Sequence, residues 1–312
     1  FKQKTAYEIR LSLVGSEMCI RDSICAQVWR ERRWRRYHWN FLTNHQAWDA
    51  LLPRFQAAIE ALPDKPGGPL EARLALETGR EWIREYIKIH LLSLLFANLY
   101  YQLLAGLLRR WMGEGSDKAL SELMAEPEGN KTVETNRALW SLAALARSLP
   151  AVGERLTHTE SPPLDTLEHV EGGAQFIAAF EQFLNQYGHR SSASWEIFSP
   201  RWCDEPGTVI QMIRSYLETG EDADPISAET RRRTVRVEAE ARLLQRIGSW
   251  HPWRRMVLVH VLGSTQRYMT LRENQRFYFD RLLLKIKRSL SHLGEQWAAE
   301  GLLESPRDLT LL

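Results

Sequence analysis

Apolar residues recur along most of this 312-residue chain at the three- and four-residue spacing of an amphipathic helix. No run of any length alternates apolar with polar residues, which is the pattern of a half-buried β-strand. Beyond residue 23 the spacing predicts helices over 46–62, 70–112, 118–124, 132–148, 174–187, 207–217, 228–247, 253–269 and 272–300. Proline and glycine clusters separate them, and we expect 150–164 to be a loop. We therefore predict an all-α chain, a multi-helix domain with long C-terminal helices.

The charges of the chain nearly balance, with 41 Lys and Arg residues against 39 Asp and Glu residues. A dedicated nucleic-acid binder usually carries a basic excess, so we predict no nucleic-acid partner. The segment 30–39 does interleave arginines with aromatic residues, and it could bind RNA through phosphates and base stacking. The balanced charge favours the other interpretation, a solvated helix face. Three cysteines do not make a disulfide scaffold, and they fit a reducing, cytoplasmic location.

Residues 1–23 stand apart from the rest of the sequence. They begin without a methionine, and Glu17, Arg21 and Asp22 interrupt their short apolar stretches, so they do not form a signal peptide. The string resembles the conceptual translation of sequencing-adapter read-through. We expect it to be a non-native segment, with a genuine N-terminal arm as the alternative, and we expect the biological sequence to start near Ile24.

Residues 89–108 contain no charged side chain over twenty positions, a length that could span a bilayer. Their polar residues, His90, Ser93, Asn98 and Gln102, fall within one half of the helical wheel. A helix with one polar seam is typical of a protein core, and polar groups in lipid are costly. We therefore predict a core helix and no membrane association.

The stretch 187–202 is too polar and too irregular to be core alone. It places Arg190, Glu196 and Arg201 within twelve residues of each other, beside tryptophans. Gly188, at the end of a predicted helix, would permit a left-handed turn. The residue chemistry by itself favours a structural Arg–Glu network that pins this loop to the helices, and a binding site is the alternative.

The same stretch carries the first part of a family pattern. Tyr-Gly-His-Arg at 187–190 is followed by Glu196, by Ser-Pro-Arg-Trp at 199–202 and by Asp-Glu-Pro at 204–206. This order resembles the PEP-utilising phosphotransferases, the group of phosphoenolpyruvate synthase and pyruvate phosphate dikinase, with rifampicin phosphotransferase as the nearest branch.

Two C-terminal motifs agree with that resemblance. Leu-Arg-Glu-Asn-Gln-Arg-Phe at 271–277 is similar to the family's Arg-Glu-x-x-Lys-Phe helix. The stretch 300–309 is similar to its Gly-Leu-Leu-x-x-Pro-x-Asp-Ile ending. The resemblance covers about residues 51–312, and the motifs are specific in combination rather than singly.

The resemblance implies a division of labour among three domains. An ATP-grasp domain uses ATP and Mg to phosphorylate a histidine on a swivelling domain, which carries the phosphoryl group to an acceptor held by a large helical domain. Residues 24–312 match the helical central domain. The sequence contains neither a Gly-rich ATP-grasp loop nor a Gly-Gly-x-x-Ser-His-x-Ala phosphohistidine motif.

From this match we expect a fragment that lacks the ATP-grasp and phosphohistidine domains. Those domains, normally in the same chain, are its predicted partners, together with a small-molecule acceptor. We expect no cofactor in this chain and no catalysis by it alone. The alternative is a standalone helical binding or scaffold domain without chemistry.

The resemblance assigns catalytic roles to Arg272, Glu273 and Arg276, which match the family's Arg, Glu and Lys. Arg276 keeps the charge of that Lys and changes its geometry. The residues also support an anion site directly, because two arginines one helical turn apart destabilise a helix unless something negative satisfies both. An incoming phosphoryl group would do so, and so would Asp280, four residues after Arg276.

The predicted substrate-binding residues lie in the loop: Arg190, Glu196, Arg201, Trp202 and His189. The family's Gly-Pro-Gly-Glu is replaced by Ser-Ser-Ala-Ser, so Ser194 stands where the first acid is expected, while Glu196 keeps the second. This departure leaves the acceptor open. The acceptor hydroxyl needs a base, for which Glu273 or Glu196 is the candidate.

Other side chains are assigned no chemistry. His90 is expected to be a satisfied core residue. Cys203 precedes Asp204 and Glu205, which would raise its pKa and make it a poor nucleophile. No histidine pair has metal-ligand spacing on a helix, so we predict no metal site.

Overall fold

The computed structural model describes residues 44–125, 129–158, 164–191, 196–219, 224–248 and 252–311. The chain divides into a unit Phe1–Asn44 and a unit His45–Leu312, and nearly all described residues belong to the second. The expected non-native segment 1–23, the patch 30–39 and Ser194 lie outside the described residues. Within those residues the regular elements are helices and there is no β-strand, which confirms the all-α prediction.

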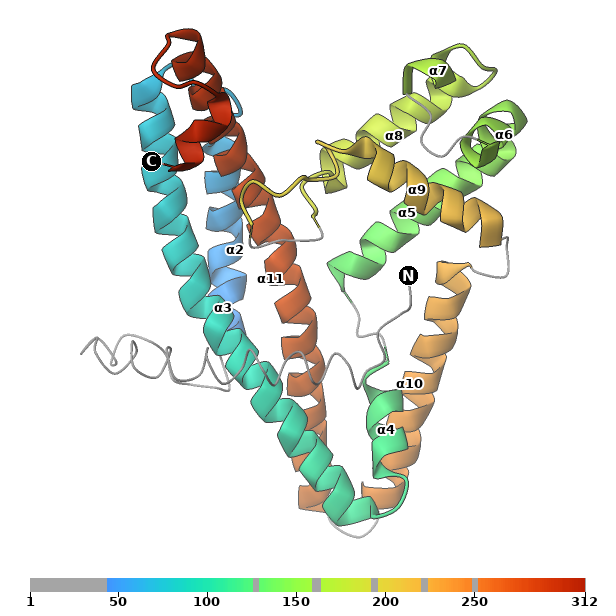
Figure 1. Ribbon diagram of the computed structural model, residues 1–312. Helices are drawn as coiled ribbons and strands as arrows, with labels where there is room; N and C mark the ends of the chain where they lie inside the picture. Colours follow the sequence, from blue (N-terminus) through green and yellow to red (C-terminus); the bar gives the residue numbers. More distant parts are fainter. Residues whose placement is uncertain are drawn as a thin grey trace, which may run out of the picture. The chain divides into compact units, whose positions relative to one another are not determined.

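The helices predicted from the apolar spacing are present, with ends that differ by a few residues (Figure 1). In chain order they are α2 Asn44–Ala61, α3 Pro69–Met112, α4 Ser116–Leu123, α5 Lys131–Ser148, α6 Pro150–His158, α7 Leu164–Glu168, α8 Gly173–Tyr187, α9 Pro206–Thr219, α10 Pro225–Gly248 and α11 Pro252–Ala299, followed by the 3₁₀ helix η3 Pro306–Leu311.

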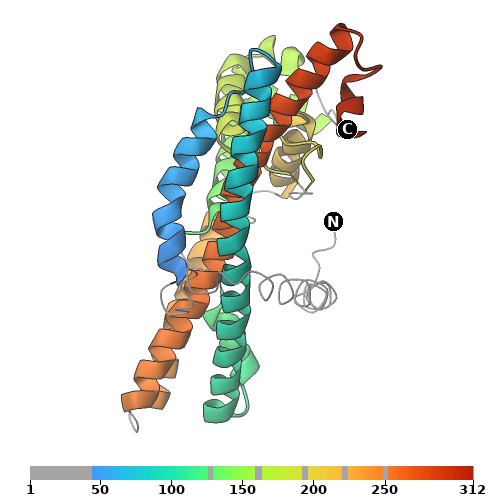
Figure 2. The same cartoon turned by 90° about the vertical axis from the view of Figure 1, so that its left-hand side faces the viewer.

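The two longest helices, α3 and α11, share the most extensive helix–helix contact (Figure 2). α2 packs onto them through large aromatic rings. Trp48 and Phe55 of α2 contact Tyr86 of α3, with ring centroids 6.1 and 5.9 Å apart. Tyr86 in turn stacks on Phe279 of α11 at 4.4 Å. These rings form the centre of the larger buried cluster, which also includes residues of α4 and α10.

The helices α5 to α9 enclose a second apolar cluster, built around Phe176 and Phe180. Phe277 of α11 also belongs to this cluster, whereas Phe279, two residues on, belongs to the larger one. α11 therefore contributes side chains to both clusters, and the segment that contains Phe277 lies where they meet.

The expectation of a loop over 150–164 is wrong, because α6 and α7 begin within it. Pro150 occupies the first helical position, where its missing N–H is not needed. The Leu149 carbonyl accepts hydrogen bonds from the main-chain N–H groups of Val152 and Gly153. Val152 and Leu156, one turn apart, are fully buried, so one apolar face was enough to form α6.

The predicted helices 253–269 and 272–300 are one continuous helix, α11, of 48 residues. The two residues between them, Thr270 and Leu271, do not break a helix, and Leu271 is buried. Packing of Leu271 therefore carries the helix across the expected gap. The continuity places the 271–277 motif in the middle of a helix and not at its start.

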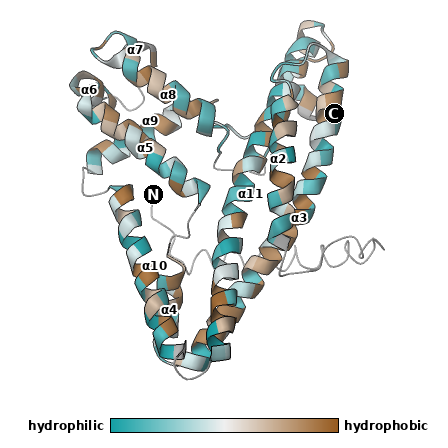
Figure 3. Cartoon of the chain, turned by 180° about the vertical axis from the view of Figure 1, so that it is seen from behind, coloured by the Kyte–Doolittle hydropathy of each residue, from teal (hydrophilic) through white to brown (hydrophobic). Residues whose placement is uncertain are grey.

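The uncharged stretch of α3 packs on α11 as a core helix does: Phe96, Tyr100 and Leu104 are buried. α3 is also the one helix in the described part of the chain that is long and apolar enough to cross a membrane. About half of the surface of Leu95 and of Leu99 is exposed. Figure 3 shows hydrophobic and hydrophilic bands alternating along the long helices. The absence of a membrane partner stays a prediction.

Candidate functional site

The chain between α8 and α9 forms a loop that folds back on itself. The main-chain N–H of Trp202 donates to the Arg190 carbonyl at 2.9 Å, and that of Cys203 donates to the Gly188 carbonyl at 2.9 Å. Gly188 is right-handed, with φ −62°, so the predicted left-handed turn is wrong. Glycine is required there for space, because a Cβ would lie 2.3 Å from the Leu184 carbonyl oxygen.

Arg201 anchors this loop to α11 from the protein interior. Its side chain has no exposed surface and forms an ion pair with Asp280 at 3.5 Å. It also donates to the carbonyls of Glu196 and His189, at 3.0 and 3.5 Å. The expected network that pins the loop is therefore present, but its carboxylate comes from Asp280 of α11 and not from Glu196.

The other predicted loop residues have different environments. The side chain of Glu196 is exposed, and only its carbonyl takes part in the network. Trp202 stacks on Phe183 of α8, with ring centroids 6.1 Å apart. The Arg190 guanidinium lies 5.7 Å from the centre of the Trp202 ring, a cation–π arrangement that fixes its direction.

Arg190 lies close to the charged residues of α11. Burial lowers the pKa of its guanidinium below the usual value. The charges of Asp280 and Glu273 oppose this lowering, and the charge of Arg276 adds to it. The ring of Phe277 lies 4.4 Å from that of His189 and 6.3 Å from that of Tyr187, so residues from the loop and from the 271–277 motif lie together. We call the group of Arg190, Arg272, Glu273 and Arg276 the arginine site.

Arg276 is the exposed member of the arginine site, and Arg272 and Glu273 are partly exposed beside it. The Nε and Nη2 atoms of Arg272 both donate to Glu273 Oε1, at 3.1 and 2.8 Å. About a third of each side chain is exposed. Asp280, which the sequence suggested as a counter-charge for Arg276, is paired with the buried Arg201. Helix α11 thus carries a partly exposed ion pair three residues before Arg276.

A buried polar network lies behind the arginine site, between α3 and α11. Gln275 Oε1 lies 2.9 Å from His90 Nδ1, and Gln275 Nε2 donates to Ser93 at 3.0 Å. Burial lowers the pKa of His90; the hydrogen bond to Gln275 opposes this, and the charge of Arg272 adds to it. His90 is thus the satisfied core residue that the sequence predicted, and it fixes the rotation of α11.

Sequence reasoning missed several members of this region. Asn274 accepts a hydrogen bond from the Lys131 main chain at 2.9 Å and donates to the Gly129 carbonyl at 2.8 Å, which fastens the start of α5 to α11. Tyr86 has no exposed surface, and its hydroxyl has no partner among the described residues. Burial raises the pKa of Tyr86 well above its usual value, and the charge of Asp280 raises it further. The sequence did contain a signal for two of these residues. Asn274 and Gln275 occupy the two positions of the 271–277 motif to which the sequence analysis assigned no role.

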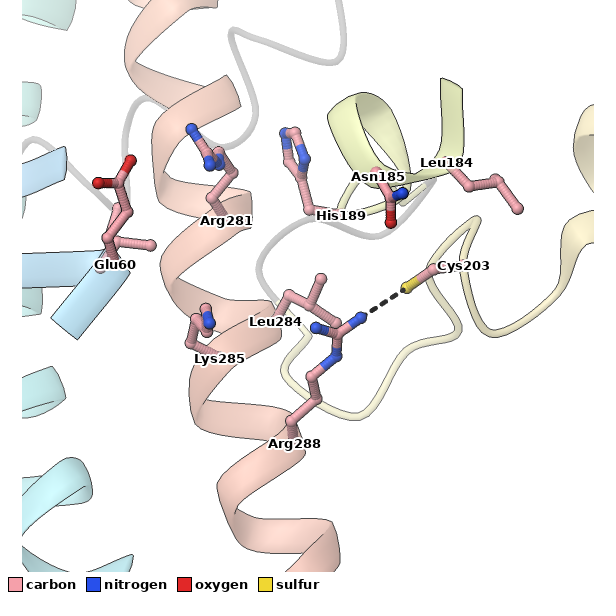
Figure 4. Close-up of a pocket in the computed structure, with 10 residues that line it drawn as sticks. Glu60, Leu184, Asn185, His189, Cys203, Arg281, Leu284, Lys285 and Arg288 are labelled. Carbon is pink, nitrogen blue, oxygen red and sulfur yellow. Dashed lines mark hydrogen bonds between the residues drawn. The ribbon is translucent and has the colours of Figure 1, made fainter. Parts of the chain in front are cut away.

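His189 lines a pocket of about 290 Å³ (Figure 4). Its ring meets Phe277 edge to face at 4.4 Å. Burial lowers the pKa of His189 well below its usual value, and the charges of Arg281, Arg190 and Arg201 lower it further. The imidazole is therefore neutral at physiological pH.

Cys203 lines the same pocket. Burial raises the pKa of its thiol and Asp204 raises it further, which confirms the predicted direction, although burial is the larger cause. In the described residues no group of three or more His, Cys, Asp and Glu side chains is arranged to hold a metal ion.

Comparisons with known proteins agree on one family. A family model described as the rifampicin phosphotransferase fourth domain matches residues 90–273. The rifampicin phosphotransferase of Bacillus cereus is 34% identical over 35% of this chain and 13% of its own length. Chondramide synthase cmdD of Chondromyces crocatus is 31% identical over 54% of this chain and 4% of its own length. The uncharacterized phosphotransferase YvkC of Bacillus subtilis is 25% identical over 59% and 22%. The chain thus spans less than a quarter of the length of each of these relatives.

Proposed function

Because this chain belongs to the rifampicin phosphotransferase family of PEP-utilising phosphotransferases, we propose that it is the helical domain that holds the acceptor during phosphoryl transfer. The acceptor is a hydroxylated small molecule, of the class of apolar natural products or antibiotics. The phosphoryl group arrives on the histidine of a swivelling domain, after an ATP-grasp domain has phosphorylated that histidine with ATP and Mg²⁺.

One observation carries this proposal. The motifs at 187–190 and 271–277 are more than eighty residues apart in sequence, yet the ring of Phe277 lies 4.4 Å from that of His189 and 6.3 Å from that of Tyr187 in the folded chain. Two further features fit a transfer site: about a third of each of the Arg272 and Glu273 side chains is exposed, and the family match includes both residues. A standalone scaffold has no need for three arginines and a glutamate at one place.

The residues divide the chemistry between them. Guanidinium groups stabilise the charge on the equatorial oxygens of a phosphoryl group during its transfer. Arg190, Arg272 and Arg276 would supply these guanidinium groups. Glu273 would take the proton from the acceptor hydroxyl as its oxygen forms the new O–P bond. The N–P bond breaks at the same time, and its electron pair stays on the imidazole of the donor domain. Arg201 and Trp202 hold Arg190 in place.

The test supplies the donor separately. A phosphohistidine domain from a PEP-utilising phosphotransferase is labelled with ³²P and mixed with this chain, using rifampicin and a panel of hydroxylated natural products as acceptors. We expect the chain to accelerate transfer of ³²P from the donor domain to an acceptor. The variants Arg276→Gln and Glu273→Gln should lower the rate of that transfer by about a hundredfold or more. Arg214→Gln, a surface change on α9 with the same loss of charge, is the matched control.

The alternative of a scaffold without chemistry makes the opposite prediction. In that case the wild-type chain, the two site variants and the control variant all leave the labelled domain unchanged with every acceptor. That result would remove the transfer-site interpretation. A cytoplasmic location and the lack of a nucleic-acid partner remain predictions.

A further inference from the structure

A chain of three hydrogen bonds links buried side chains of α3 and α11 directly beside Arg276. Ser93 donates its hydroxyl proton to the Ile89 carbonyl at 2.9 Å, so its oxygen can only accept from Gln275. The donor is therefore the Gln275 amide Nε2, at 3.0 Å, and the amide oxygen lies 2.9 Å from His90 Nδ1. Since a carbonyl oxygen only accepts, the imidazole carries a proton on Nδ1. Each bond in the chain thus has one possible direction.

These polar groups fit together in one register of the two helices. Leu271 and Phe279 lie one turn before and one turn after Gln275 on α11, and both are buried apolar side chains. A slip of α11 by one turn in either direction would therefore place an apolar side chain against His90 and Ser93. Buried polar groups without partners are unfavourable, and a buried polar contact is one way in which helix pairs fix their register. The hydrogen bonds thus specify one height and one rotation of α11 on α3.

The opposite side of α11 is held as well. Phe277 is buried, and its ring lies 4.4 Å from that of His189 in the loop. Two residues correspond to a rotation of about 200° along a helix, so Gln275 and Phe277 point to nearly opposite sides of α11. Arg276 lies between them, about 100° from each, and is exposed. Its direction is therefore set by two contacts, a hydrogen-bonded one with α3 and an aromatic one with the loop.

We propose that Gln275 is a positioning residue of the arginine site. Its hydrogen bonds hold α11 on α3, so that Arg272 and Arg276 reach one phosphoryl group together. This inference rests on the proposed function and adds to it a residue that does not itself touch the substrate. Two guanidinium groups bind one phosphate strongly only when both are aligned with its oxygens. Arg272 lies three residues before Gln275 and Arg276 one residue after it, so any rotation of this segment moves both.

Two variants separate positioning from stability. Gln275→Met removes the amide and leaves the His90 N–H buried without its acceptor, which should lower Tm. The double variant His90→Phe with Gln275→Met removes both partners, and the new ring can still stack on Tyr86, as the imidazole does at 5.0 Å. Ser93 keeps its bond to Ile89. Because replacing both partners by apolar groups of similar shape is nearly neutral, we expect the double variant to unfold at a Tm close to that of the wild-type chain.

Inorganic phosphate is the probe, because it needs neither a donor domain nor an acceptor. Bound phosphate should protect Arg272 and Arg276 from phenylglyoxal, and mass spectrometry of the peptide that contains both measures how fast each is modified. We expect the double variant to need about tenfold more phosphate for half-protection than the wild-type chain, which corresponds to the loss of one charge-assisted hydrogen bond. In the ³²P transfer assay its kcat should fall by about tenfold, with little change in the KM for the acceptor.

Thr265→Val is the matched control, because this buried threonine of α11 donates to the Val261 carbonyl of its own helix at 2.7 Å. It should leave protection and transfer unchanged. The proposal would be overturned by a correctly folded double variant that phosphate protects as well as it protects the wild-type chain, or by an equal loss of protection in Thr265→Val. Protection without transfer in the wild-type chain would count against the proposed function alone. Absence of protection in the wild-type chain would remove the anion site, and the role of Gln275 with it.

Discussion

Replacement of Asp280 by asparagine tests how the loop after α8 is held. The change keeps the shape of the side chain and removes the only carboxylate that forms an ion pair with Arg201 in the described structure. Arg201 has no exposed surface and Asp280 is 4% exposed by side chain, so water cannot replace the lost charge. Breaking a buried ion pair by removing one partner costs about 3–5 kcal/mol.

The lower end of that range applies to Asp280→Asn. The ion-pair distance of 3.5 Å is long, and the asparagine oxygen still accepts a hydrogen bond from Arg201. The carbonyls of Glu196 and His189 also remain as acceptors. We therefore expect a loss of about 3 kcal/mol in the free energy of unfolding. For a unit of this size that corresponds to a fall in Tm of roughly 6–12 °C.

Urea unfolding of the full chain, followed by circular dichroism at the helical minimum, measures this loss. Asp49→Asn is the matched control, because Asp49 pairs with Arg267 at 2.7 Å while both side chains are about half exposed. A surface pair of this kind contributes about 0–1 kcal/mol. If Asp280→Asn were no more destabilising than Asp49→Asn, the claim that the buried pair holds the loop to α11 would be refuted.

Two further predictions concern stability. Gly188→Ala should destabilise the chain by about 1–3 kcal/mol, because its Cβ would lie 2.3 Å from the Leu184 carbonyl oxygen. Gly106→Ala, with open space around it, should stabilise α3 by about 0.5–1 kcal/mol. Thermal unfolding measures both changes, and equal Tm values for the two variants would contradict this prediction. The pKa of Asp204 is lowered: burial, the largest single effect, acts against the shift, and the hydrogen bonds from Lys287 and from the Arg201 main chain together with the charge of Lys287 outweigh it. The stability that Asp204 contributes is therefore present above its unfolded pKa of about 3.9 and is lost as pH falls through the lower folded value. Asp204→Asn should flatten this acid limb of the unfolding curve, and an unchanged limb would argue against the assignment.

The sequence predicted those features of the fold that are determined by the apolar pattern of a single helix. A regular apolar spacing predicted the position of α3, and it predicted α11 as two helices rather than one, because burial of a single face is enough to form each segment. The same reasoning failed over 150–164. There the prolines at 150, 162 and 163 suggested a loop, and the one-turn pairing of Val152 with Leu156 was too short a pattern to stand out.

The site shows the same division. Arg190 and Glu273 were both identified, since the motifs that contain them could be read locally. The partner of Arg201 could not, because Asp280 lies on another helix and 79 residues away. Nor could the contact between the rings of His189 and Phe277, which lie on the loop and on α11. Pairings of this kind are fixed by the packing of α11 against the loop, and local spacing does not contain that information.

The continuity of α11 has a consequence for how tolerant this region is to length change. Arg276 and Arg281 are five residues apart on one uninterrupted helix, so their angular offset is set by the helical repeat alone. A single residue inserted between them would turn everything that follows by about 100° and advance it by about 1.5 Å. Arg281 would then leave the pocket, and Leu283 and Ile286 would leave the larger cluster. The packing of α11 therefore fixes the number of residues between its two arginines.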